Sequence, residues 1–228
     1  MITVILLFLT IIGSDMNTME HTPDLADYCK ILSGEFDKID GGRVQTLKEV
    51  GDFIIGELEQ ERRAQLLFIC THNSRRSQYG QIWALFASEF YGIENIRTFS
   101  GGTESTAFNP RAVSSLERAG FMVSVDNREE DNPHYSFQSG TFMSDEMYSK
   151  LYSDPGNSQE NFCALMVCSQ ADEACPFVPG AAERISLPYE DPKKFDGTER
   201  EDEAYDERCR QIGREMFYVM NYVRSRIF

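Results

Sequence analysis

An apolar run with no polar alternation, residues 66–69, constrains the fold of this chain most. Such runs are typical of central parallel strands that are buried on both faces. Further strands are expected at 96–100, 121–125, 162–168 and 184–187, and apolar periodicity predicts helices at 77–91, 110–119 and 203–226. Strands that alternate with helices predict an α/β fold: a parallel, doubly wound sheet of about four strands with helices on both faces.

Glycine, proline and polar residues indicate where these elements end. Gly101-Gly102 is expected to form a turn after the second strand, and Pro110 to open the next helix. Residues 127–161 are polar and rich in turn residues, so we expect loops there, with edge strands near 135–138.

The sequence pattern divides the chain into three parts. We expect an apolar N-terminal segment at 1–18, a helical extension at 19–64 and a catalytic domain at 65–228. Helical spacing in the extension is interrupted at Gly41-Gly42, which predicts two helices. Helices of this kind usually pack on the main domain, and a regulatory or dimerising role is the alternative.

The first residues leave three interpretations open. Residues 2–12 resemble the apolar part of a signal sequence but are too short to cross a bilayer. No Lys or Arg precedes them, and no clear cleavage site follows. They are an over-extended translation start, with Met16 or Met19 as the true first residue, or an export or membrane-attachment signal, or an ordinary segment of the fold.

Charge and cysteine usage narrow the class of function. The formal net charge of −15 argues against nucleic acid as a partner, because nucleic-acid phosphates need a basic surface. It says little about small anions, which a few N–H groups and arginines bind locally. The 6 cysteines are irregularly spaced, which is untypical of a disulfide scaffold. We therefore expect a reducing, cytoplasmic location without membrane association, although the apolar N-terminus leaves export possible.

The segment with the clearest chemistry runs from Cys70 to Ser77, CTHNSRRS, between a predicted strand and a predicted helix. Backbone N–H groups and a helix N-terminus converge on an anion at such a junction. The helix dipole and a nearby guanidinium favour the thiolate form of Cys70, which makes it a nucleophile. Arg76, six residues later, can hold two oxygens of a tetrahedral anion at once.

All the residues that follow Cys70 in this loop are candidates for oxyanion binding. Ser77 or Ser74 is expected to hydrogen-bond to the sulfur, and Asn73 to brace the backbone. A single loop histidine such as His72 more often faces solvent than takes part in catalysis. The oxyanion-binding candidates are Thr71, His72, Asn73, Ser74, Arg75, Arg76 and Ser77.

Two later clusters add possible partners. Cys168 also follows a predicted buried strand, and Cys175 lies seven residues on; they are a redox pair or one buried and one loop cysteine. Asp191, between Glu190 and Pro192, is a general acid above the anion loop or part of an ordinary Asp-Pro turn. The histidines and remaining cysteines lack paired spacing, so no metal site is expected.

Together these segments resemble the low-molecular-weight protein tyrosine phosphatases and the thioredoxin-coupled arsenate reductases, which share one fold. CTHNSRRSQ, CSQADEACPF and EDP occur in the order that these families have, and SGGT followed by FNPRAVSSLERAGF is similar to their second strand and next helix. The resemblance covers about residues 65–222. It implies that Cys70 is the nucleophile, Arg76 the oxyanion clamp and Asp191 the general acid, with Asn73 and Ser77 supporting the loop.

The resemblance ranks three hypotheses for function. Cys168 and Cys175 match the reductase relay, which tyrosine phosphatases lack, so arsenate reduction through Cys70, Cys168 and Cys175 comes first. It implies thioredoxin or another dithiol as reductant and no bound cofactor. Hydrolysis of a phosphotyrosyl substrate is the second hypothesis, and an oxyanion or redox sensor without turnover is the third.

The chain departs from the family pattern in three places. Arg75 stands where the reductases often have a second cysteine, and Gln81 where a glutamate that helps to bind potassium is common. SVDNREEDNPHY replaces the short motif after the third strand. The phosphatase hypothesis also requires an aromatic entrance, for which the available residues are Tyr79, Trp83 and Tyr189.

Overall fold

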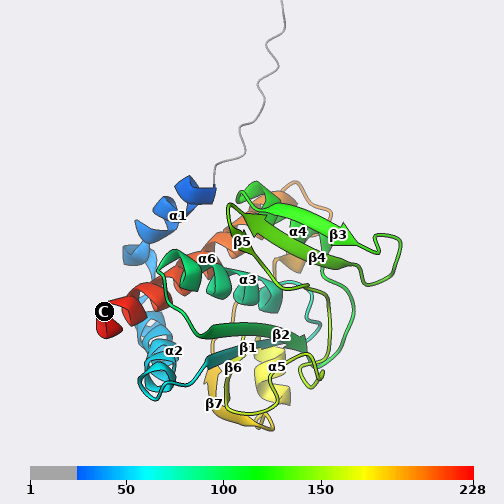
Figure 1. Ribbon diagram of the computed structural model, residues 1–228. Helices are drawn as coiled ribbons and strands as arrows, with labels where there is room; N and C mark the ends of the chain where they lie inside the picture. Colours follow the sequence, from blue (N-terminus) through cyan, green and yellow to red (C-terminus); the bar gives the residue numbers. More distant parts are fainter. Residues whose placement is uncertain (1–24) are drawn as a thin grey trace, which may run out of the picture.

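The computed structural model describes residues 25–228, so the predictions for residues 1–18 lie outside it. Four parallel strands form the main sheet in the order β2-β1-β6-β7 (Figure 1). Their bounds are β1 Ala64–Cys70, β2 Ile96–Gly102, β6 Phe162–Met166 and β7 Ala181–Ser186. All five residues of β6 are buried, as both-face coverage requires. The predicted parallel α/β sheet is confirmed.

Two crossovers leave the centre of this sheet in opposite directions. Helix α3 (Arg76–Phe90) connects β1 to β2, and α5 (Ser169–Ala174) connects β6 to β7. Because such crossovers are right-handed, helices that lead in opposite directions lie on opposite faces of the sheet. A crevice opens between the carboxyl ends of β1 and β6, where the direction changes.

The remaining helices pack around this frame. The long helix α6 (Glu201–Ile227) contacts α3, α2 (Gly41–Glu59), α1 (Leu25–Ser33) and α4 (Pro110–Arg118). Short 3-10 turns are η1 (Phe36–Lys38) and η2 (Pro192–Phe195). None of the helices in residues 25–228 combines the length and apolar character needed to cross a bilayer.

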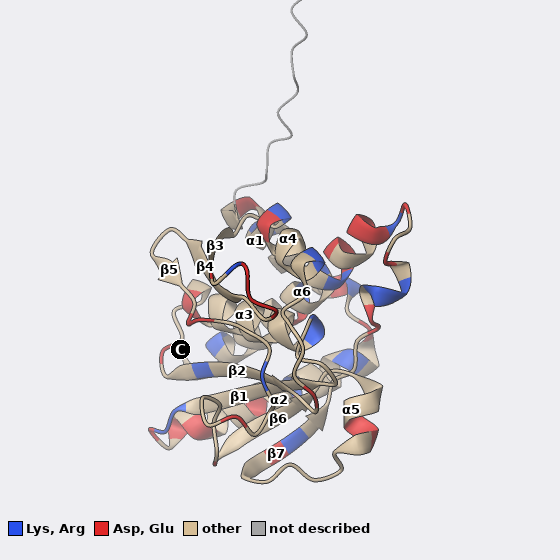
Figure 2. Ribbon diagram, turned by 90° about the vertical axis from the view of Figure 1, so that its right-hand side faces the viewer, with Lys and Arg blue, Asp and Glu red and all other residues tan. Residues whose placement is uncertain are grey.

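Charged residues of both signs are mixed along the described ribbon (Figure 2). Between α4 and α6 they form ion pairs: Arg111 Nε lies 2.7 Å from Glu201 Oε1, and Arg118 Nη2 lies 2.7 Å from Asp206 Oδ1. These pairs neutralise part of the acidic excess locally.

A second, antiparallel sheet within residues 122–143 was not foreseen. It has the order β3-β4-β5, with β3 Met122–Asp126, β4 His134–Ser139 and β5 Phe142–Met143. The edge strand expected near 135–138 is β4, but the strand expected at 121–125 is its partner β3 and not part of the main sheet. Aromatic residues anchor this small sheet, since Phe142 meets Phe86 of α3 with ring centroids 4.9 Å apart.

Both glycine pairs behave differently from the prediction. Gly41-Gly42 does not break a helix but forms the first turn of α2, because Asp40 caps it and accepts hydrogen bonds from Gly42 N and Arg43 N. Gly101-Gly102 is not a turn but the end of β2, paired with Ile69 and Cys70. A Cβ on Gly101 would lie 2.3 Å from Tyr152 Cα, so the requirement there is close approach of two backbones.

The N-terminal helices share the hydrophobic core of the sheet domain. Trp83 of α3 is fully buried, and Tyr28 of α1 stacks on it with ring centroids 5.7 Å apart. Trp83 Nε1 donates to Cys209 Sγ of α6, and the absence of a side chain at Gly213 lets α6 approach the indole. Residues 25–64 and the sheet domain thus share one core, and the boundary at residue 64 stays a prediction from the sequence resemblance.

An ion-pair cluster also fixes the end of α1 to α6. Glu35, 6% exposed, pairs with Arg210 and Arg214 of α6 and with Lys38, whose Nζ lies 2.6 Å from Glu35 Oε1. Hydrogen bonds from Arg210, helped by Lys38, lower the pKa of Glu35 from 4.5 to about 2.

We expect Glu35→Gln to destabilise the protein in a pH-dependent way. A depressed carboxyl pKa contributes stability that is complete above the unfolded pKa of about 4.5 and is lost as the pH falls to about 2. The variant should unfold about 1–3 kcal/mol more easily at pH 7, and the difference should shrink towards pH 3. Urea unfolding at both pH values measures this.

Asp27→Asn is the matched control, because Asp27 pairs with Lys30 on the exposed surface of α1. Its unfolding should differ little from that of the wild type at either pH. A Glu35→Gln penalty that is equal at pH 7 and pH 3 would show that the carboxylate charge is not what ties α1 to α6.

Candidate active site

Cys70 and Cys168 lie at the carboxyl ends of neighbouring strands, on the two sides of the central crevice. Cys70 is the last residue of β1, and Cys168 follows β6, whose Met166 pairs with Ile69. Thr71 stands between the two cysteines, with its Oγ1 3.5 Å from Cys168 Sγ. The chain topology therefore brings two thiols, 98 positions apart by their numbers, to one edge of the sheet.

The sulfur of Cys70 is held by a buried side-chain network. Ser77 Oγ lies 3.1 Å from Cys70 Sγ and accepts from Asn73 Nδ2 at 2.9 Å. Of the two serines considered, Ser77 therefore contacts the sulfur. Asn73 has a φ of 45°, a left-handed conformation that Asn tolerates, and its Oδ1 accepts from Lys150 N at 2.8 Å. Asn73 thus links the loop to Ser77 and to the backbone of Lys150.

Every carbonyl oxygen from Cys70 to Ser74 accepts a hydrogen bond from outside the loop. The backbone groups Thr103 N, Glu104 N and Asn109 N donate to Cys70 O, Thr71 O and Ser74 O, in that order. The hydroxyl groups of Ser149 and Thr106 donate to His72 O. Gln78 Nε2 donates to Asn73 O. Among the residues that the structure describes, none of the backbone N–H groups of 72–75 has a hydrogen-bond partner. Carbonyls turned outward and unpaired N–H groups are the properties of an anion nest.

Sequence reasoning missed the residues that hold the loop from outside. In segment 148–150, Tyr148 O accepts a hydrogen bond from Gln78 Nε2, Ser149 Oγ donates to His72 O, and Lys150 N donates to Asn73 Oδ1. Two of these three contacts use backbone atoms, which any residue type can provide. The sequence therefore carried no signal for them.

Arg75 and Arg76 both pair with Asp191 above the sulfur. Arg76 Nη2 lies 2.9 Å from Asp191 Oδ2, and Arg75 Nε lies 2.9 Å from Asp191 Oδ1. Arg76 Nη1 also donates to Tyr189 O at 2.9 Å. A small hollow is lined by Cys70, His72, Ser74, Arg75, Arg76 and Asp191. The three residues expected to act as nucleophile, clamp and acid thus surround one hollow.

Asp191 lies at the start of η2, as the Asp-Pro pair suggests. Its Oδ1 accepts from Lys193 N at 3.1 Å, which caps the turn. The side chain is 28% exposed, so it lies at the mouth of the hollow. His72 is 40% exposed and lies 3.5 Å from Glu104, which agrees with a histidine that faces solvent.

The segment between β7 and Asp191 is braced from the N-terminal helix α2. Arg43 stacks on the Tyr189 ring at 4.4 Å, and its Nε lies 2.8 Å from Glu215 Oε2. Tyr189 Oη donates to the same carboxylate at 2.8 Å. Tyr189 O in turn accepts from Arg76, so α2 contributes to the placement of the site.

The aromatic residues considered for a phosphotyrosine entrance do not form one. Tyr79 and Trp83 are fully buried, and Tyr189 is 5% exposed. Tyr79 Oη bonds to Ser115 Oγ within the core. Tyr79 and Trp83 belong to the buried face of α3, and Tyr189 follows β7 with its ring in the core, so none of the three residues that the sequence offered lines an entrance.

Cys168 and Cys175 stand at the two ends of α5. Cys168 is the N-cap residue, fully buried, and its Sγ accepts from Ala171 N at 3.4 Å. Cys175 is the C-cap residue and is partly exposed. Arg184 holds the helix, since its Nε donates to Cys175 O at 2.9 Å and it pairs with Asp172. All 6 cysteines are free thiols.

The residues present do not fit the potassium site that the resemblance implies. Gln81 offers one neutral, buried oxygen, Oε1, without a hydrogen-bond partner. Asn73 Oδ1, Asn73 O and Tyr148 O already accept N–H groups from Lys150 and Gln78. No group of three or more His, Cys, Asp or Glu residues within the described part of the chain could hold a metal ion.

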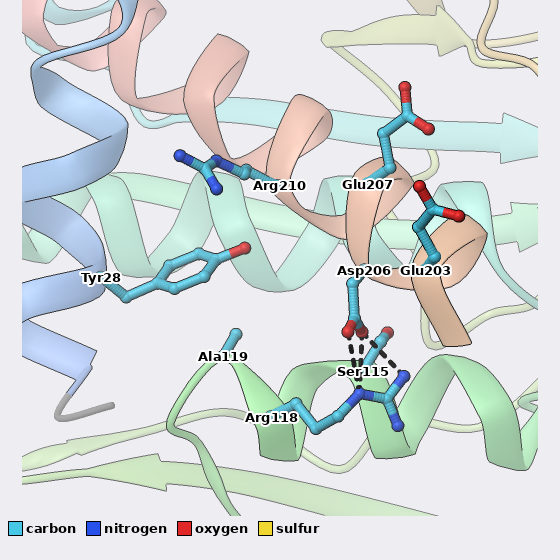
Figure 3. A pocket seen from close by; sticks show the side chains of 8 residues that line it. All are labelled: Tyr28, Ser115, Arg118, Ala119, Glu203, Asp206, Glu207 and Arg210. Carbon is cyan, nitrogen blue, oxygen red and sulfur yellow. Dashed lines mark hydrogen bonds and ion pairs between the residues drawn. The ribbon is translucent and has the colours of Figure 1, made fainter. Parts of the chain in front are cut away.

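A larger cavity of about 410 Å³ lies among α1, α4 and α6, away from the loop (Figure 3). Its walls are Tyr28, Ser115, Arg118, Ala119, Glu203, Asp206, Glu207 and Arg210. Arg118 is paired with Asp206 and Arg210 with Glu35. With both guanidiniums paired and further carboxylates nearby, it lacks the anion-binding character of the loop.

No family model matches the chain. An arsenate reductase of Bacillus licheniformis is 30% identical over 149 residues, which is 65% of this chain and 88% of the relative. An arsenate reductase of Bacillus subtilis is 28% identical over 149 residues, again 65% and 88% of the two chains.

A thioredoxin-dependent arsenate reductase of Corynebacterium glutamicum superposes with a TM-score of 0.38 and 15% identity, covering 87% of this chain and 96% of the other. A low-molecular-weight phosphotyrosine phosphatase of Vibrio cholerae gives 0.48 and 13%, covering 72% and 99%.

The four-stranded parallel sheet and the Cys70–Arg76 loop at its central crevice define the class: α/β proteins with a cysteine-centred loop at the carboxyl end of a parallel sheet. Within that class, the similarity to the Bacillus licheniformis protein over most of its length is decisive. The chain belongs to the arsenate reductase family.

We expect Gly102→Ala to disrupt the anion loop. A Cβ there would lie 2.2 Å from Glu104 O, 2.7 Å from Thr71 O and 2.8 Å from Asn73 N, so the loop backbone must move. A displacement near 1 Å is enough for about a hundredfold loss in a positioned site, and phosphate binding should weaken by at least about tenfold. Calorimetric titration with phosphate measures this.

Gly56→Ala in α2 is the control, because no atom lies within 4 Å of the added Cβ. It should bind phosphate normally and gain roughly 0.5–1 kcal/mol of stability. Equal phosphate binding by Gly102→Ala and the wild type would contradict the packing argument.

Proposed function

We propose that the protein reduces arsenate to arsenite with a three-cysteine relay. The observation that carries this proposal is the placement of Cys70 under an anion nest with Cys168 at the end of the adjacent strand. Its arsenate reductase relatives support the same substrate. Phosphatase chemistry alone gives no reason for a second thiol beside the nucleophile.

In the first step the Cys70 thiolate attacks the arsenic of arsenate. A sulfur–arsenic bond forms and an arsenic–oxygen bond breaks, with the leaving oxygen protonated by Asp191 as general acid. The N–H groups of 72–75 and the guanidinium of Arg76 bind the remaining oxygens. The anion competes with Asp191 for Arg76, so binding frees the carboxyl from one of its two guanidinium partners.

In the second step Cys168 attacks Cys70 Sγ. The sulfur–sulfur bond forms as the sulfur–arsenic pair of electrons passes to arsenic, which leaves as arsenite. The two cysteines lose two electrons together and arsenic gains two. Cys175 then attacks Cys168, a Cys168–Cys175 disulfide results, and Cys70 returns to the thiolate.

The last exchange requires α5 to unwind. Cys168 and Cys175 cap opposite ends of a six-residue helix, and seven helical steps separate two Cα atoms by roughly 10 Å. A disulfide needs Cα atoms about 4.4–6.8 Å apart. Thioredoxin or another dithiol would then reduce the disulfide, which fits a reducing, cytoplasmic location.

Phosphate-ester hydrolysis is the second candidate, favoured by Cys70, Arg76 and Asp191 around one hollow. It needs neither Cys168 nor Cys175. A sensor that binds oxyanions without turnover is the third candidate, and it would show tight arsenate binding with no product.

Cysteine variants separate these candidates. With arsenate and thioredoxin, Cys70→Ser, Cys168→Ser and Cys175→Ser should each abolish turnover, because every relay thiol is needed. With an aryl phosphate, only Cys70→Ser should abolish hydrolysis. Coupled oxidation of thioredoxin and release of the aryl alcohol are the two assays.

Cys163→Ala is the matched control. Burial raises the pKa of this β6 thiol far above its ordinary value, so it takes no part as a thiolate. Undiminished arsenate turnover in Cys168→Ser or Cys175→Ser would reject the relay.

Asp191→Asn tests the acid. An amide cannot give a proton to the leaving oxygen, so turnover should fall by about 10²–10⁴-fold. Alkylation of Cys70 by iodoacetamide, which needs no acid, reports whether the loop stays intact. Full turnover in the variant would exclude Asp191 as the general acid.

A further inference from the structure

We propose that Arg75 is a positioning residue: it keeps Asp191 over the anion loop when Arg76 turns from Asp191 to the bound oxyanion. The inference rests on the proposed chemistry of Cys70 and Asp191. It assigns a role to a side chain that stands where the related reductases often have a cysteine.

Two guanidiniums share one carboxylate in this structure. Arg75 Nε lies 2.9 Å from Asp191 Oδ1 as an ion pair without hydrogen-bond alignment, and its Nη2 donates to Oδ2 at 3.5 Å. Arg76 Nη2 lies 2.9 Å from Oδ2. The guanidinium nitrogen nearest to Oδ1 belongs to Arg75 and the one nearest to Oδ2 belongs to Arg76, so Arg75 keeps the carboxylate as its ion-pair partner when Arg76 leaves.

Burial makes this sharing necessary. The side chains of Arg75 and Arg76 are 7% and 8% exposed. A buried guanidinium is strongly unfavourable without a paired anion, and Asp191 is the only carboxylate among the described residues that pairs with Arg75. Two cations for one anion leave a local excess of positive charge, which attracts an oxyanion.

Arg76 exchanges Asp191 for the oxyanion in two steps. An oxyanion in the nest offers oxygens to Arg76, whose fork can bind two of them. Arg76 then gives up Asp191 Oδ2, and Arg75 alone among the side chains still holds the carboxyl group. Without Arg75, only Lys193 N would hold Asp191, a residue already 28% exposed.

Arg75 also stays next to the Asp191 carboxylate that remains after proton transfer. Asp191 takes up a proton from solvent once Arg76 has left it, and that proton moves to the leaving oxygen as the bond from sulfur forms and the bond to that oxygen breaks. The carboxylate that remains is negative and stays next to the Arg75 cation. Arg75 thus acts on the reaction through Asp191 and does not itself touch the reacting atoms.

A double-mutant cycle on the full-length chain tests this. Arg75→Gln, Asp191→Asn and the double variant are assayed on arsenate with thioredoxin and on two aryl phosphates, nitrophenyl phosphate and phenyl phosphate. Phenoxide is the poorer leaving group and depends more on the acid. Arg75→Gln should lose about 10–100-fold on phenyl phosphate and less than about threefold on nitrophenyl phosphate. The double variant should be no slower than Asp191→Asn.

Two further variants separate positioning from folding. Arg75→Lys keeps the charge but not the fork, so it should fall between wild type and Arg75→Gln, and it replaces that variant if Arg75→Gln does not fold. Arg118→Gln removes an arginine that pairs with Asp206 outside the loop and should retain full turnover. Equal losses on both aryl phosphates with a raised KM would make Arg75 an anion clamp and overturn the proposal.

A crystal structure with bound phosphate decides the matter independently of turnover. The expected result is Arg76 on the phosphate and Arg75 still on Asp191. Arg75 on the phosphate, or Asp191 turned to solvent, would overturn the proposal. If the wild type turns over neither arsenate nor aryl phosphate, the proposed function fails, whereas this structure still tests the arginine exchange.

Discussion

The site depends on hydrogen bonds that hold the anion loop from outside. Each carbonyl from Cys70 to Ser74 accepts from a neighbouring segment, which leaves the N–H groups of 72–75 free to face an anion. Preorganised donors of this kind need no rearrangement when charge develops. Because segments 103–109 and 148–150 and Gln78 of α3 supply the contacts, the reactive loop is shaped by parts of the chain that take no part in the chemistry.

The topology of the sheet then determines which second thiol lies near Cys70. Since α3 and α5 lead away from β1 and β6 in opposite directions, the ends of these two strands form the open crevice. Cys168 reaches it for the same reason as Cys70: both residues follow a central strand. A cysteine after β2 or β7 would be a strand further away.

Much of the fold could be predicted because its signals are local. Apolar runs marked β1 and β6, and periodicity marked α3 and α6. Contacts between distant segments were not visible. Gly102 looked like a turn residue although it serves a close backbone approach, and the small β3-β4-β5 sheet is held by aromatic packing against α3. The pairing of Arg75 with Asp191 spans 116 positions, beyond the reach of any spacing rule.

The stacking of Tyr28 on Trp83 has a consequence for any shortened form of the chain. The resemblance to reductases begins near residue 65, yet the indole of Trp83 is covered by α1, and Tyr189 beside the site is held by Arg43 of α2. A chain shortened to begin at residue 65 would therefore expose a large aromatic face to water and would lose the contact that holds the Tyr189 ring.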